Sequence, residues 1–163
     1  MELKKRIDLK YILLGVYLLA FTIYIINGLQ PAQASVYDVS GSLNIPSIGL
    51  VTDVTTLHLV DHELNTPDDI AGSFSRAENK TLLIGHSSTV FSELHNIKLG
   101  DQIDYNGVKY VVKSSEVFEK SAINMGSLLK KADIDTIVIM TCAGENLPNS
   151  DATHRLIVVA EVV

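Results

Sequence analysis

Three side chains with complementary chemistry lie at the ends of apolar, β-branched runs. Cys142, the single cysteine of the chain, follows Thr136–Thr141 (TIVIMT), and Arg155 precedes Leu156–Val163 (LIVVAEVV). His86 follows a shorter apolar run. A thiolate is a nucleophile, an imidazole transfers protons near neutral pH, and a guanidinium stabilises a developing oxyanion. The three residue types therefore form a set of nucleophile, acid–base and oxyanion stabiliser.

Each of these residues also has a purely structural interpretation. A cysteine after a β-run is often a small buried hydrophobe, a histidine beside glycine is often solvated, and an arginine at the head of a strand is often a surface charge. Other histidines stand at positions 58, 62, 95 and 154. His154 adjoins Arg155 and should point to the opposite face of a strand, which makes it a weaker partner for the same site.

The chemical interpretation depends on how the two β-branched runs pair. A connection of 12 residues, 143–154, separates Cys142 from Arg155. If the runs pair antiparallel, the end of the first lies opposite the start of the second. We therefore predict that the thiol and the guanidinium face each other at one rim of a sheet.

The region after Gly41 is predicted to be mainly β. The polar segment Thr66–Lys80 is expected to be a loop, Val90–Leu94 a helical turn, and Asn124–Lys131 a short helix with Asn124 as its N-cap. Strands are expected at residues 42–48, 50–59, 81–84, 102–105, 108–114, 136–141 and 156–163, with Asn106-Gly107 as a hairpin turn. Many short strands separated by turns predict a single closed or nearly closed β-barrel with one or two short helices.

The N-terminal segment is predicted to be a transmembrane helix that anchors the chain. Residues 11–29 are 19 residues without a formal charge, enough to cross the roughly 30 Å hydrocarbon core of a bilayer. Residues 1–10 are rich in lysine and arginine. The positive-inside rule therefore places 1–10 in the cytoplasm and the residues after 30 outside the cell, as in a single-pass cell-membrane protein.

A cleaved signal peptide is the alternative interpretation of the same segment. Ala32-Gln33-Ala34 has the small-x-small pattern of a cleavage site, although the apolar run is longer than the usual 7–15 residues. Both interpretations export the remainder of the chain. Residues 30–41 are expected to be a linker, and 42–163 the exported domain.

Composition narrows the function classes. The chain has 163 residues, 47% apolar and 20% charged, which is typical of a globular domain and excludes intrinsic disorder as the main state. Its net charge of −6 and its 6% aromatic content argue against nucleic acid as a partner. One cysteine excludes an intrachain disulfide and a multi-cysteine zinc site.

Five stretches, in family order, resemble the sortases. They are LNIPSIGL (43–50), LLIGHSSTVFSEL (82–94), IKLGDQIDYNGVKYVV (97–112), IMTC (139–142) and RLIVVAEV (155–162). The chain departs from the family at Ile139, where leucine is common, and at Ser87 and Ser88, where arginine or asparagine often follows the histidine. Residues 71–80 (AGSFSRAENK) also lack the Pro-Gly and Gly-Asn pairs that often precede the histidine in the family. These departures leave the subclass open.

The resemblance implies a sortase-like barrel and a membrane-anchored, extracytoplasmic cysteine transpeptidase. A sorting signal of the Leu-Pro-x-Thr-Gly type would lie in a groove, and Cys142 would attack its carbonyl to form a thioester. His86 would protonate the leaving amine and deprotonate the incoming one, while Arg155 would stabilise the oxyanion or hold the substrate backbone. Thr141 is a candidate substrate-binding residue that supplies a hydroxyl or orients the strand end. The alternative is that it is present only because threonine favours β-strands.

The resemblance also implies the partners. They are surface proteins with a C-terminal sorting motif, an amine acceptor on a peptidoglycan precursor or a pilin, and the membrane. The chemistry requires no metal. Some sortases use calcium bound by acidic loops, for which Asp68, Asp69 and Glu78 are candidates, and solvated loop charge is the alternative. A thioester-forming hydrolase or carboxypeptidase-like enzyme on the same fold, and a non-catalytic anchored binding module, are the rival functions.

Overall fold

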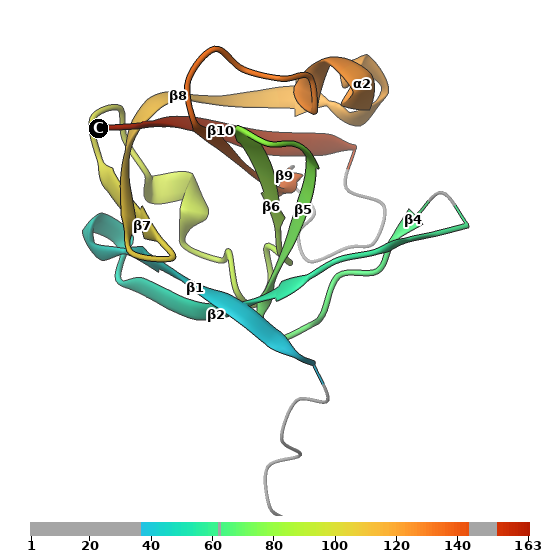
Figure 1. The fold of residues 1–163 in the computed structure, drawn as a ribbon, viewed down its shortest axis with the longest axis horizontal. Helices are drawn as coiled ribbons and strands as arrows, with labels where there is room; N and C mark the ends of the chain where they lie inside the picture. The colour runs from blue at the N-terminus through green and yellow to red at the C-terminus, as the bar shows by residue number, and fades with distance from the viewer. Residues whose placement is uncertain (1–36, 62, 144–152) are drawn as a thin grey trace, which may run out of the picture. The chain divides into compact units, whose positions relative to one another are not determined.

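The computed structural model describes residues 37–61, 63–143 and 153–163. Within them, strands close into a barrel in the order β1-β2-β5-β6-β9-β10-β8-β7, which confirms the predicted closed β-barrel (Figure 1). The barrel strands are β1 (Val39–Ile45), β2 (Leu50–Thr56), β5 (Ala71–Ala77), β6 (Lys80–Ile84), β7 (Gln102–Tyr105), β8 (Val108–Glu119), β9 (Thr136–Ala143) and β10 (His154–Val162). A two-stranded ribbon, β3 (Leu59–Val60) and β4 (Glu63–Leu64), and the short helical segments η1 (Pro46–Ile48), η2 (Leu94–Asn96), η3 (Lys120–Ala122) and α2 (Met125–Leu128) complete the described elements.

The predicted N-terminal segments fall mostly outside this description. The expected cytoplasmic segment 1–10, the anchor 11–29 and most of the linker 30–41 are not among the described residues. In the part of the chain that is described, no helix has both the length and the apolar character needed to cross a bilayer. Strand β1 begins at Val39, three residues before the predicted boundary at Ser42.

The barrel has an interior core and a second apolar cluster outside it. The interior is filled by large side chains that are almost fully buried, including Leu43, Ile45, Val54, Leu83, Phe91, Leu94, Ile103, Ile137 and Ile139. Leu82, Val138 and Ile157 form the outer cluster, against which Leu128 and Leu129 of the α2 region pack. Strands β6, β9 and β10 are therefore buried on both faces, which explains why their sequences are continuous apolar runs.

The prediction that Thr66–Lys80 is a loop is wrong for residues 71–77, which form β5. This strand pairs parallel with β2 and antiparallel with β6. Its small residues, which made it resemble a loop, allow neighbouring chain to approach closely: a Cβ at Gly72 would lie 2.4 Å from the Leu57 side chain. Tertiary packing here overrides weak strand propensity.

Other elements differ from prediction mainly at their ends. The first strand stops at Ile45 because Pro46 begins the turn η1, which ends at Gly49 with φ of 65°. The predicted hairpin turn is confirmed, and Asn106 and Gly107 both have positive φ, as a two-residue hairpin loop requires. Asn124 caps α2 as predicted, because its side chain accepts a hydrogen bond from the Ser127 amide.

Candidate active site

The pairing of β9 with β10 brings the thiol and the guanidinium together. The two strands are antiparallel, and Cys142 lies directly opposite Arg155, as predicted. Residues that face each other in this way project to the same side of a sheet, with Cβ atoms roughly 5 Å apart. On its other side Arg155 faces Phe118 of β8. Because Cys142 lies one residue from the end of β9, this pair is at the barrel rim.

The parallel pairing of β6 with β9 brings His86 to the same level. Ile84, the last residue of β6, lies opposite Met140, so the chain two residues further on reaches the level of Cys142. His86, Cys142 and Arg155 line one cavity of about 740 Å³. The other described side chains that line it are mostly apolar, and none of them is acidic: Leu59, Leu64, Thr66, Phe74, Arg76, Ile84, Met125, Leu129, Met140 and Thr141. The structure thus brings the three predicted site residues to one place.

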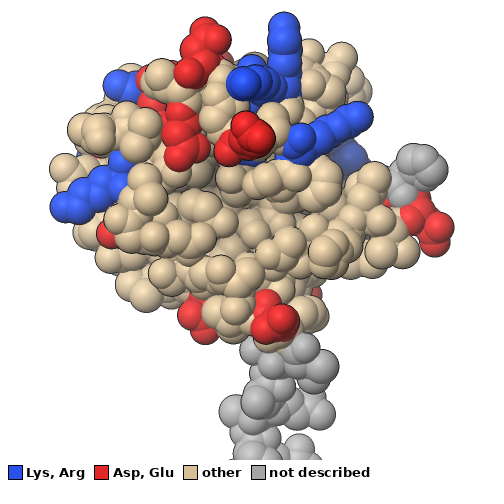
Figure 2. Space-filling model, in the orientation of Figure 1, with Lys and Arg blue, Asp and Glu red and all other residues tan. Residues whose placement is uncertain are grey.

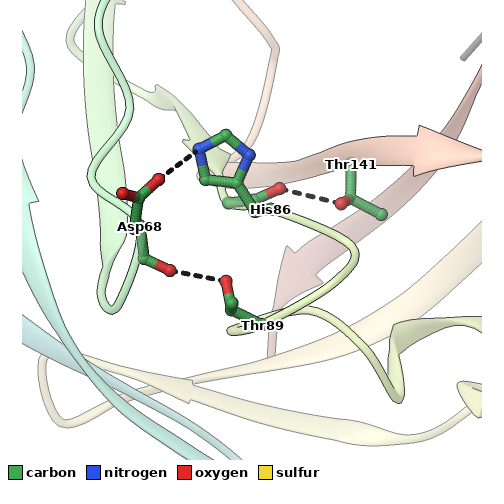
Figure 3. Close-up of polar contacts among 5 residues, drawn as sticks. Asp68, His86, Thr89 and Thr141 are labelled. Carbon is green, nitrogen blue, oxygen red and sulfur yellow. Dashed lines mark hydrogen bonds and ion pairs between the residues drawn. The ribbon is translucent and has the colours of Figure 1, made fainter. Parts of the chain in front are cut away.

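The loop before β5 holds the imidazole. His86 Nε2 lies 3.5 Å from Asp68 Oδ1, and the Asp68 carbonyl oxygen accepts a hydrogen bond of 2.5 Å from Thr89 Oγ1 (Figure 3). The Asp68 side chain is 97% exposed and that of His86 is 44% exposed. Water screens such a pair, so it contributes little to the stability of the fold.

Sequence reasoning missed the pairing of Asp68 with His86; it considered Asp68 as a solvated loop charge or a calcium ligand. Over the described residues, no three histidine, cysteine or acidic side chains gather in a way that could hold a metal ion. Nothing in the local sequence marks Asp68 as a partner of His86, because the β5–β6 hairpin separates them along the chain.

Thr141 links the nucleophile strand to the histidine segment. Its Oγ1 donates a buried hydrogen bond of 2.8 Å to the Gly85 carbonyl oxygen, between the residue before Cys142 and the residue before His86 (Figure 3). The Thr141 side chain is 4% exposed, and Gly85 is also buried. The hydroxyl proton is therefore engaged within the protein, where it orients the end of β9.

A second cavity is lined by the same end of β9. It has a volume of about 800 Å³ and, like the first, is lined by Thr141 and Cys142. His95, Lys98 and Ser115 are among its polar lining residues. Cys142 is therefore a lining residue of both cavities, and of the described histidines His86 is the one that lines the first.

The chain is similar to known proteins in sequence pattern and in fold. Residues 43–163 match the family model described as the sortase domain. Sortase A of Listeria monocytogenes is 20% identical over 77% of this chain and 87% of that chain, with a TM-score of 0.59. Sortase C-1 of Actinomyces oris is 24% identical over 78% and 74%, with a TM-score of 0.59.

A third solved structure, the sortase D5 transpeptidase of Clostridium perfringens, is 21% identical over 77% of this chain and 79% of that chain, with a TM-score of 0.58. The search of curated proteins finds no match. At these identities the structural likeness establishes the fold, and its spread over sortases of several classes leaves the subclass open.

Proposed function

Because the chain belongs to the sortase family of cysteine transpeptidases, we propose that it cleaves the C-terminal sorting signal of surface proteins and transfers them to an amine. The acceptor is a peptidoglycan precursor or a pilin, and residues 11–29 anchor the enzyme with its barrel outside the cell. The convergence of His86, Cys142 and Arg155 on one cavity carries the proposal.

Each residue has a defined part in the proposed reaction. The Cys142 thiolate adds to the carbonyl carbon before the scissile bond, and Arg155 donates hydrogen bonds to the resulting oxyanion. The carbon–nitrogen bond then breaks, His86 gives its proton to the departing amine, and a thioester remains on Cys142. An incoming amine attacks the thioester, its proton passes to His86, and the thiolate leaves.

The two cavities support transfer rather than cleavage alone. The apolar lining of the first suits a sorting peptide with apolar residues such as leucine and proline. While the acyl chain occupies that cavity, the second offers the amine a separate route to Cys142. Thr141, which lies between them, positions the strand end for both steps.

The test is peptide transfer by the full chain in detergent micelles. Peptides of the Leu-Pro-x-Thr-Gly type are incubated with a set of amines, and the products are identified by mass. We expect amide products from the wild type and at least a hundredfold loss in Cys142→Ala, His86→Ala and Arg155→Ala. His58→Ala, at an exposed histidine that lines neither of these two cavities, is the matched control.

The rival functions give different results in the same experiment. A hydrolase yields the free acid at the same rate with and without amines. A binding module without catalysis leaves every peptide intact, and peptide cleavage that persists in Cys142→Ala contradicts the proposed nucleophile.

A further inference from the structure

A second guanidinium, that of Arg76, lines the first cavity in addition to Arg155. Arg76 belongs to β5 and falls at a register shift between Ser75 and Ala77, two residues after Phe74, which faces Leu82 of β6. Phe74 and Arg76 both line the cavity. Prediction missed this residue because β5 was expected to be a loop.

Arg76 lies far from the thiol along the strands. It falls between Ser75 and Ala77, which face Thr81 and Lys80 of β6. Thr81 in turn faces Ile137 of β9, five residues before Cys142. At about 3.3 Å per residue this separation is roughly 16 Å, which an extended peptide covers in four to five residues.

No acidic side chain of the described residues lines the cavity beside the Arg76 guanidinium. Among the described residues, the ion pairs are His86–Asp68 and Lys113–Glu161, and the Arg76 side chain makes no hydrogen bond. Figure 2 shows acidic side chains at several places on the surface. Asp61 and Glu63 belong to the β3–β4 ribbon.

The surroundings of Arg76 make it a receptor for an anion. The chain carries a net charge of −6, yet the described residues that line this cavity include two arginines and a histidine and no acidic residue. Apolar side chains of the ribbon and of the α2 region, including Leu64 and Leu129, form the rest of its lining. A guanidinium beside such surfaces binds a carboxylate with two parallel hydrogen bonds.

We propose that Arg76 determines specificity by pairing with an acidic side chain of the sorting peptide, four to five residues before the residue that acylates Cys142. In a Leu-Pro-x-Thr-Gly peptide these are the two positions that precede the leucine. The inference rests on the proposed function and adds to it a substrate class: sorting signals preceded by aspartate or glutamate.

The experiment compares peptides with glutamate, glutamine or lysine at these two positions, using the full chain in detergent. For the wild type we expect kcat/KM to be about two- to fivefold higher with glutamate than with glutamine, and lowest with lysine, as for an ion pair with the exposed Arg76 side chain. Arg76→Gln should remove the preference, and Arg76→Glu should reverse it in favour of lysine. Lys109→Gln, an exposed cation on β8 that lines neither cavity, should keep it.

A binding measurement separates failure of this inference from failure of the proposed function. In a Cys142→Ala background, fluorescence anisotropy of the same labelled peptides should give affinities in the same order: glutamate, then glutamine, then lysine. The differences in affinity between these peptides should become smaller as salt is raised. Cleavage without any dependence on peptide charge overturns the role of Arg76 alone, as does a glutamate preference that survives Arg76→Gln. Charge-dependent binding without cleavage of any peptide supports Arg76 and contradicts transpeptidation.

Discussion

Replacing Thr141 with valine should weaken the link between the nucleophile strand and the histidine segment. Valine has nearly the same shape as threonine, so the change removes the hydroxyl and its 2.8 Å hydrogen bond to Gly85 without altering the packing. The Gly85 carbonyl is buried and loses its partner. A buried group left unsatisfied costs about 1–3 kcal/mol, so we expect the free energy of unfolding to fall by that amount.

The effect on catalysis should exceed the effect on stability. The hydrogen bond fixes the distance between the chain at Gly85–His86 and the chain at Thr141–Cys142, and a displacement of about 1 Å in such a site can cost a hundredfold in rate. We expect at least a tenfold loss of kcat/KM in Thr141→Val and nearly full activity in Thr141→Ser, which keeps the donor. Urea unfolding and peptide transfer measure the two quantities.

Thr136 provides a matched control at the other end of β9. It is also 4% exposed, and its Oγ1 donates a hydrogen bond of 2.9 Å to the Ile134 carbonyl oxygen, away from the site. Thr136→Val should lower stability but leave kcat/KM unchanged. If Thr141→Val keeps wild-type stability and activity, or if both valine variants lose activity equally, the positioning role of Thr141 is refuted.

Three further changes test other parts of the structure. Gly85→Ala places a Cβ 2.7 Å from the buried Phe91 ring, so unfolding in urea should show a loss of about 1–3 kcal/mol with reduced transfer activity. Asn106→Ala removes the acceptor of the Ser42 amide at a position with φ of 54°, and should cost about 1–2 kcal/mol by the same assay. Burial, reinforced by the hydrogen bond to Asp135, raises the pKa of Tyr110. Above about pH 10 the unfolded chain therefore releases a proton that the folded one keeps, and the free energy of unfolding should fall by up to about 1.4 kcal/mol per pH unit, less steeply in Tyr110→Phe.

The parts of the fold that sequence predicts are those specified by local chemistry. The runs that became β9 and β10 are β-branched because both their faces are buried, and their antiparallel pairing follows from a short connection. Asn106-Gly107 fits its turn because both residues have positive φ. The sequence was therefore enough to predict that Cys142 lies opposite Arg155.

The parts that sequence did not predict depend on contacts between distant segments. Strand β5 consists largely of small and polar residues, and its pairing with β2 and β6 makes it a strand. Missing β5 also concealed the place of Arg76 in the cavity. The Asp68–His86 pair likewise arises only when the loop before β5 packs beside the end of β6.

Trapping the acyl-enzyme tests the central claim most directly. The full chain is incubated with a Leu-Pro-x-Thr-Gly peptide without added amine, quenched in acid and analysed by intact mass and peptide mapping. We predict a mass gain equal to the peptide portion up to its threonine, carried as a thioester on Cys142, released by hydroxylamine and absent in Cys142→Ala. Peptide cleavage with no such adduct at any time, or with the acyl group on another residue, would contradict the account.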